Sequence, residues 1–428
     1  LYQFWVHTEQ VPKLGWFDRW FCSPSNHRVH HAVNDPYLDK NYGGILIVWD
    51  RLFGSFQIES EKCVYGTRSG LNSWDPLWAN FEIYWALLKD SWHTRLWGDK
   101  VRVWFKPPGW RPADLAQRFP KPEFELARVA RFHPPISRAV AWFAGLQFAL
   151  LLAGVSMFLW FSDSLPLAQS AVWLAALTAA LWALGAVLQG RIGMLEVLLI
   201  EAAALATATG TVGLLELHHL FKPLAMLFAI LFVASSVHPI RAGGRLNVLL
   251  MAALTASLAG DVLLMLPGHF VPGLVAFLLA HLCYLVLFKL GTVHLQPVGA
   301  GTGREVMGLR SVWFPSRLAL GLTLGVGAAM YAVLWHGLPG ALRLPVAAYV
   351  AIIALMAAQA IGRATVLRNH AAAMVAVGAG FLMLSDALLA VNRFVQPLPL
   401  APLWVLGTYY AAQILIARNA IASASNRL

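Results

Sequence analysis

Residues 247–266 read NVLLMAALTASLAGDVLLML, a run in which Asp261 is the one charged side chain. About twenty apolar residues in a helix span the hydrocarbon core of a bilayer. Similar runs follow one another along most of the chain, and we place spans at 139–161, 166–189, 192–215, 222–237, 247–266, 271–293, 317–337, 341–361, 370–391 and 400–417. The sequence therefore predicts an all-α polytopic membrane protein with about ten transmembrane helices.

The composition agrees with a membrane protein and excludes other classes. The chain has 428 residues, of which 58% are hydrophobic and 12% are charged, whereas soluble domains carry about 25% charged residues. This excludes an ordinary soluble protein, a disordered chain and a collagen-like chain. Fourteen of the 21 acidic residues lie in 1–136, so we expect this segment to be irregular, partly helical, and cytoplasmic or interfacial.

The net charge of +11 does not indicate nucleic acid as a partner. The basic residues stand singly in short loops between apolar runs, and arginines fall in alternate connections, which is the pattern that orients membrane proteins. The positive-inside rule places those connections and the N-terminal segment in the cytoplasm. We expect a multi-pass protein of the inner membrane in a bacterium, or of the endoplasmic reticulum in a eukaryote.

A histidine cluster near the start of the chain reads NHRVHH. The spacing of its histidines, His27, His30 and His31, puts three imidazoles on one face of a helix. Imidazole suits iron, copper or zinc. The alternative is an interfacial helix that happens to be rich in histidine, and we favour metal binding.

The residues around this cluster carry further motifs. The stretches LYQFWVHTE (1–9), SPSNHRVHH (23–31), DKNYGG (39–44), WDRLFG (49–54) and FKPPGW (105–110) occur in this order. Together they resemble the fatty acid hydroxylase, or sterol desaturase, superfamily, and within it the alkylglycerol monooxygenases. The resemblance extends into the first spans, so we assign 1–136 and the helices of 137–211 to this half.

The resemblance implies a di-iron cofactor held by several histidine boxes. It implies that His27, His30 and His31 form the last box, and that His7 is a further ligand or lies behind the ligands. The two earlier boxes are absent, because the chain starts after them. We therefore expect 1–136 to be the C-terminal part of an incomplete monooxygenase domain in which the di-iron centre is not assembled.

Two carboxyl groups lie within otherwise apolar spans. A charge at bilayer depth costs about 2.5–3.5 kcal/mol on insertion scales, so Asp261 and Asp386 are functional candidates. The span directions put both in the outer half of the bilayer, where Lys222 opens its span and Asn392 and Arg393 close theirs. Alternatively, the two carboxyls only bond to neighbouring helices or pair with these basic residues, and we favour a site.

A second set of motifs covers the C-terminal half, which we assign to 212–428. The stretches are LFKPL (220–224), SLAGDVLL (257–264), GLVAFLLAH (273–281), LSDALLAVNRF (384–394) and YYAAQ (409–413). They resemble the YhhN-type lysoplasmalogenase family. The resemblance implies cleavage of the vinyl ether bond of lysoplasmalogens to a fatty aldehyde and a glycerophospho-alcohol.

The residues suit this chemistry. Vinyl ether hydrolysis begins with protonation of carbon, which produces an oxocarbenium-like cation, so it needs a proton donor and an anion. Two carboxyls in unequal environments can divide these roles, and we expect Asp261 and Asp386 to be that pair, with the roles open. We expect six residues to bind substrate: Lys222 and Arg393 at the phosphate, and His281, Asn392, Tyr409 and Gln413 along the pocket. We expect no cofactor in this half; a metal held by His281 and the aspartates is the weaker alternative.

Both resemblances point to ether lipids, and both reactions release a fatty aldehyde. We therefore predict a membrane-embedded ether-lipid catabolic enzyme whose partners are lysoplasmalogen, alkylglycerol and the bilayer. One alternative is a proton-coupled transporter or a non-catalytic lipid-binding protein that uses the carboxyls as a relay. Another is a structural membrane domain with no activity on ether lipids. The sequence does not indicate an oligomeric state.

Overall fold

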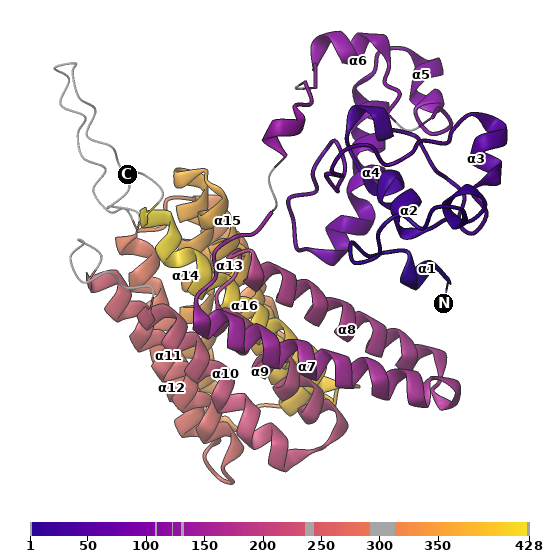
Figure 1. Cartoon of the computed structure of the whole chain (residues 1–428). Helices are drawn as coiled ribbons and strands as arrows, with labels where there is room; N and C mark the ends of the chain where they lie inside the picture. Colours follow the sequence, from indigo (N-terminus) through magenta and orange to yellow (C-terminus); the bar gives the residue numbers. More distant parts are fainter. Residues whose placement is uncertain are drawn as a thin grey trace. The chain divides into compact units, whose positions relative to one another are not determined.

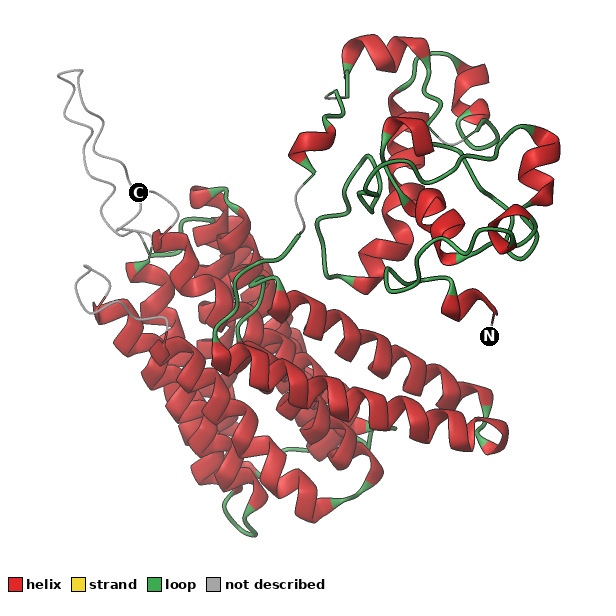
Figure 2. Ribbon diagram, viewed as in Figure 1, coloured by secondary structure: helices red, strands yellow, loops and turns green. Residues whose placement is uncertain are grey.

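The computed structural model describes residues 2–107, 109–121, 123–129, 132–235, 244–291 and 313–425, with the backbone alone at 168, 244 and 421–425. In these stretches the chain forms helices, loops and two isolated β-bridges (Figure 1, Figure 2). Nine of the described helices are long and apolar enough to cross a bilayer. The predicted fold class is confirmed: the chain is an all-α polytopic membrane protein.

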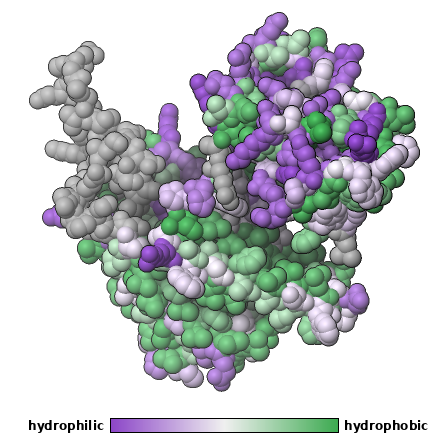
Figure 3. Space-filling model, viewed as in Figure 1, coloured by the Kyte–Doolittle hydropathy of each residue, from purple (hydrophilic) through white to green (hydrophobic). Residues whose placement is uncertain are grey.

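The chain forms two compact units, Leu1–Arg191 and Ile192–Leu428. The first joins short helices to a long helical hairpin. Its helices are α1 (Tyr2–Trp5), α2 (Pro24–His31), α3 (Val48–Phe53), α4 (Pro76–His93), α5 (Trp97–Arg102), α6 (Ala113–Arg118), α7 (Arg138–Phe161) and α8 (Leu167–Leu188). In Figure 3 the short-helix part presents many hydrophilic side chains to the viewer, as expected for an aqueous or interfacial segment.

Local signals set the start of the short helices. The Ser23 hydroxyl accepts from the backbone N–H of Asn26, and Pro24 occupies the first turn of α2, which are common features of a helix N-terminus. The Asp75 carboxylate caps α4 by accepting from N–H groups of its first turn. Asp75 also lies 3.5 Å from Arg191, which follows α8, so the cap joins α4 to the end of the hairpin.

The second unit is a helical bundle. Its helices are α9 (Met194–Val212), α10 (Leu215–Ser235), α11 (Gly244–Met265), α12 (Phe270–Leu290), α13 (Arg317–Leu334), α14 (Gly340–Leu367), α15 (His370–Phe394) and α16 (Ala401–Ser425). The most extensive packing joins α15 to α16, α11 to α12 and α9 to α10, and α14 packs on α12, α13 and α15. Buried small residues such as Ala225, Ala253, Ala357 and Ala412 let the helices approach closely.

The helices differ from the predicted spans at three places. The helix predicted to start at 222 begins at Leu215. Lys222 therefore lies about two turns inside α10 rather than at its N-terminus. The predicted span 400–417 forms α16, but α16 is not among the nine candidate spans of the described residues. α9 packs within the second unit, although we assigned it to the first half. The predicted ends at 236–237 and 292–293 lie outside the described residues.

Candidate functional site

An ion pair is buried between three helices of the second unit. Nζ of Lys222 on α10 lies 3.3 Å from Oδ1 of Asp261 on α11, and the two side chains are 10% and 3% exposed. The hydroxyl of Tyr409 on α16 donates to Oδ2 of Asp261 at 2.7 Å. Both carboxylate oxygens are therefore engaged, as a buried charge requires.

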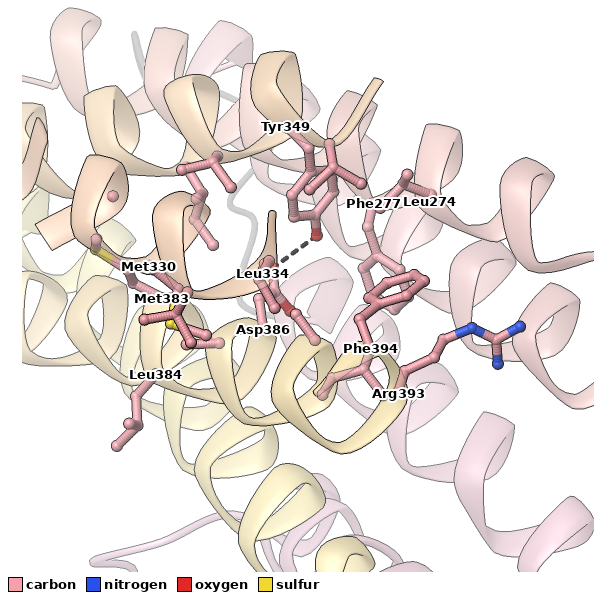
Figure 4. A pocket seen from close by; sticks show the side chains of 18 of the residues that line it. Leu274, Phe277, Met330, Leu334, Tyr349, Met383, Leu384, Asp386, Arg393 and Phe394 are labelled. Atoms are coloured by element: carbon pink, nitrogen blue, oxygen red, sulfur yellow. Dashed lines mark hydrogen bonds between the residues drawn. The ribbon is translucent and has the colours of Figure 1, made fainter. Parts of the chain in front are cut away.

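Asp386 on α15 is the second carboxyl; its side chain is partly buried, with 19% exposed, and its surroundings differ. The hydroxyl of Tyr349 on α14 donates to Oδ2 of Asp386 at 2.6 Å (Figure 4). Nε2 of His281 on α12 lies 3.6 Å from the same oxygen. Among the described side chains no lysine or arginine pairs with Asp386, so its carboxyl lacks the counter-charge that Asp261 has.

A polar network supports the ion pair. The hydroxyl of Tyr284 donates to Oε1 of Gln413 at 2.6 Å, and Nε2 of Gln413 donates to Oγ of Ser257 at 3.3 Å. Ser257 and Gln413 each lie about one helical turn from Asp261 and Tyr409. The network therefore ties α11, α12 and α16 together next to the ion pair.

Two cavities meet at Asp386. One, called here the polar cavity because His218, Lys222 and Asp261 are among its lining residues, has a volume of about 330 Å³ and is also lined by Asp386. The apolar cavity has a volume of about 530 Å³ and is walled almost wholly by hydrocarbon and aromatic side chains (Figure 4). The cavities share four lining residues, which are Leu264, Phe277, Asp386 and Leu389. Asp386 is thus the one ionisable group that faces both.

Three imidazoles converge in the first unit. Nε2 of His27 lies 2.9 Å from Nε2 of His7 and 3.0 Å from Nε2 of His31, and the last two atoms are 3.2 Å apart. The three ligand atoms lie within 4.8 Å of one another, which suits one metal ion. Among the described residues His30 is not in this group; its Nδ1 lies 3.3 Å from the carbonyl oxygen of Lys40.

Contacts behind the imidazoles orient them. Nδ1 of His7 contacts the carbonyl oxygen of Gln3, and Nδ1 of His27 lies 3.8 Å from Sγ of Cys22. A contact of this kind at one ring nitrogen fixes the ring and directs the other nitrogen at a metal.

Arg28 holds the His7 segment against α2. Its guanidinium donates to the carbonyls of Thr8 and Val11 at 3.0 and 2.9 Å and forms a 2.7 Å ion pair with Glu59. Arg28 stands between two cluster histidines in the sequence, and we did not predict its positioning role.

The buried His27 and the exposed His31 both favour the neutral form that binds metals. Burial, together with the imidazoles of His31, His7 and His30, lowers the pKa of His27 to about 4. Burial and the imidazoles of His30 and His7 also lower the pKa of His31. Near neutral pH these two rings therefore offer lone pairs rather than charges.

Two family models match the chain. The YhhN family model matches residues 217–420, and the fatty acid hydroxylase model matches residues 1–55. Over 203 residues the chain is 34% identical to lysoplasmalogenase TMEM86B of Homo sapiens. This match covers 47% of this chain and 76% of that protein. The chain belongs to the YhhN family.

The first part of this YhhN-family chain is similar to other proteins. It is 38% identical over 157 residues to alkylglycerol monooxygenase of Homo sapiens, which covers 36% of this chain and 35% of that protein. It is also 44% identical over 112 residues to alkylglycerol monooxygenase of Danio rerio. This match covers 26% of this chain and 25% of that protein. The chain thus spans about a quarter to a third of these monooxygenases. Both resemblances seen in the motifs are confirmed. No solved structure matches the chain at a significant level.

Most predicted site residues of the YhhN-family unit are brought together. Five line the polar cavity: Asp261, Asp386, Lys222, Asn392 and Tyr409. His281 and Gln413 line neither cavity. They lie one contact further out, His281 against Asp386 and Gln413 between Tyr284 and Ser257.

Arg393 lies elsewhere. It lines the apolar cavity, and its guanidinium stacks 4.0 Å over the ring of Phe270. In Figure 4 the guanidinium points away from Asp386. The expectation that Arg393 and Lys222 bind one phosphate therefore does not fit this geometry, because the two side chains line different cavities.

Four residues of the site are absent from the sequence prediction: Tyr349, Tyr284, Ser257 and His218. Tyr349 contacts Asp386, whereas Tyr284 and Ser257 belong to the polar network beside the ion pair. His218 lines the polar cavity, and its Nδ1 lies 2.9 Å from the carbonyl oxygen of Ala206. The signal in the sequence is the polar residues before Lys222, which lie outside the predicted spans.

The histidine group fits one metal ion. Three converging imidazoles, two of them held at the outer ring nitrogen, are a suitable ligand set for iron. The described residues supply three ligands at this point, which is fewer than a two-iron centre requires. His7, His27 and His31 would hold the ion, and an iron there supplies redox chemistry.

Removal of the Lys222 charge is expected to destabilise the fold. In Lys222→Met the Asp261 carboxylate keeps its burial and loses its cation, which costs about 3 kcal/mol or more. We expect a large drop in the unfolding midpoint in detergent. In the double variant Lys222→Met, Asp261→Asn most of that stability should return. A single variant as stable as the native chain would contradict the ion pair.

The histidine geometry predicts which residues bind metal. We expect His7→Ala, His27→Ala and His31→Ala each to weaken Co²⁺ binding by at least about tenfold, measured by visible absorption during titration. His30→Ala is the matched control and should bind as the native chain does. If His30→Ala weakened Co²⁺ binding as much as the other three variants do, the metal site would have to include His30, which would contradict this prediction.

Proposed function

We propose that the YhhN-family unit hydrolyses the vinyl ether bond of lysoplasmalogens to a fatty aldehyde and a glycerophospho-alcohol. The observation that carries this proposal is the pair of unequal carboxyls on one cavity, the buried Asp261 and the partly buried Asp386. The similarity to lysoplasmalogenase TMEM86B supports the same substrate class. The similarity of the first unit to alkylglycerol monooxygenases supports a setting in ether-lipid metabolism.

The reaction needs an acid, an anion and one water. A proton adds to the alkene carbon remote from oxygen, and positive charge spreads over the adjacent carbon and the ether oxygen. Water adds to that carbon, and the resulting hemiacetal breaks its bond to the glycerol oxygen. Aldehyde and alcohol leave, the acid regains a proton from the added water, and no oxidant is consumed.

Asp261 is suited to the anionic role. Its charge is compensated by Lys222 and by the Tyr409 hydroxyl, so it stays ionised although it is buried. A fixed carboxylate at the polar cavity stabilises the cationic intermediate and accepts the proton of the attacking water, which then passes to Asp386 and restores the acid. Lys222 faces the same cavity, so the glycerophosphate group lies there in this proposal.

Asp386 is suited to the acid role. A partly buried carboxyl with no lysine or arginine beside it costs more free energy to ionise than a paired one. Its contacts with Tyr349 and His281 both involve Oδ2, which leaves Oδ1 for substrate. Its place at the junction of the two cavities puts it where the polar head and the hydrocarbon chain of a lysoplasmalogen join.

Isosteric loss of either carboxyl is expected to abolish turnover. Asp261→Asn and Asp386→Asn should each lower kcat by at least about a hundredfold, measured as aldehyde release by purified, folded protein from 1-alkenyl lysophosphoethanolamine. Asp163→Asn, a carboxyl outside the second unit, is the matched control and should keep the native rate.

Two outcomes would contradict the proposal. Full activity in both variants would show that the carboxyls are not the acid and the anion. Proton-coupled uptake by reconstituted vesicles, without cleavage of the lysolipid, would favour the transporter alternative.

A further inference from the structure

The apolar cavity is built by five helices, α11 to α15. The ionisable groups in its wall are Asp386 and Arg393, together with the Tyr349 hydroxyl, and the remaining lining is aliphatic or aromatic. A cavity of about 530 Å³ with such a wall binds hydrocarbon rather than a polar ligand. Its position beside the polar cavity leaves Asp386 at the boundary between them.

Along α15 the cavity extends to both sides of Asp386. The lining includes Gly380 toward the middle of the helix and Arg393 toward its end. With a rise of 1.5 Å per residue, Gly380 lies about 9 Å from Asp386 along the axis. The Arg393 end is partly covered by the stacking of its guanidinium on Phe270, whereas Met330 and Met383 lie on the opposite side of Asp386 in Figure 4.

Gly380 leaves an open space in the wall. It shares a face of α15 with Met383, Leu384 and Ala387, which also line the cavity. A Cβ at Gly380 would meet no heavy atom within 4 Å. At Gly327, also in the lining, a Cβ would instead meet Val350 at 3.1 Å. Gly380 is exposed and lines the cavity, so a side chain there has room to extend along the open side of the cavity without displacing a neighbour.

We propose that the apolar cavity binds the alkenyl chain of the substrate, and that the absence of a side chain at Gly380 sets the chain length it accepts. This inference rests on the proposed function and extends it to substrate selection. The vinyl ether lies at Asp386, and the chain runs from there along α15 toward Gly380. The product aldehyde then stays in hydrocarbon surroundings while the glycerophospho-alcohol leaves through the polar cavity.

The test compares Gly380→Leu with a matched variant, Gly321→Leu. Gly321 lies on α13, lines neither cavity, and also has open space where a Cβ would stand. Aldehyde release is measured with octenyl and hexadecenyl lysophosphoethanolamine. In Gly380→Leu the ratio of kcat/KM for the hexadecenyl substrate to that for the octenyl substrate should fall about tenfold or more. In Gly321→Leu it should keep the native value.

The outcomes separate this inference from the proposed function. A native chain inactive on both substrates would contradict the proposed function itself. An active Gly380→Leu with the native ratio would overturn the inference. If Gly380→Leu is inactive on both, thermal protection by hexadecanol decides: loss of protection supports the inference, and protection equal to the native chain overturns it.

Discussion

The ion pair between Lys222 and Asp261 constrains the second unit more than any other contact, because neither charge is stable alone at bilayer depth. It joins α10 to α11, and Tyr409 adds α16 through the second carboxylate oxygen. The Tyr284–Gln413–Ser257 network secures the same helices one turn away. A buried pair of this kind is weak evidence for stability in itself but fixes how the helices align. Here the alignment places a compensated carboxylate at the polar cavity.

The contrast between the two carboxyls follows from that alignment. Asp261 has its cation, whereas Asp386 has a tyrosine and an imidazole, and both face one cavity. Two like groups in unequal surroundings are a common arrangement for dividing acid and anion roles. The neighbouring apolar cavity adds a place for hydrocarbon, so that polar head, scissile bond and chain each have a matching environment.

The sequence predicts how deep each site residue lies in the membrane better than it predicts the direction in which its side chain points. Asp261 and Lys222 stand out because a charge in an apolar run is visible without a structure. Arg393 lines the apolar cavity whereas its neighbour Asn392 lines the cavity of Lys222, because helix rotation decides which of the two faces Lys222. Tyr349 was missed, because a tyrosine in an apolar run looks like any other aromatic residue until α14 is placed beside α15. Likewise the HxxHH spacing predicts shared placement on a helix face, but only the fold separates His30 from the converging trio.

The most direct test of the account is isotopic. Purified chain is incubated in D₂O with a lysoplasmalogen and, separately, with the matching saturated alkyl ether, and the aldehyde is trapped as it forms. Proton transfer to carbon predicts aldehyde from the vinyl ether alone, with one deuterium on the carbon next to the carbonyl. Aldehyde without solvent deuterium, or equal cleavage of the saturated ether, would contradict acid-catalysed vinyl ether hydrolysis.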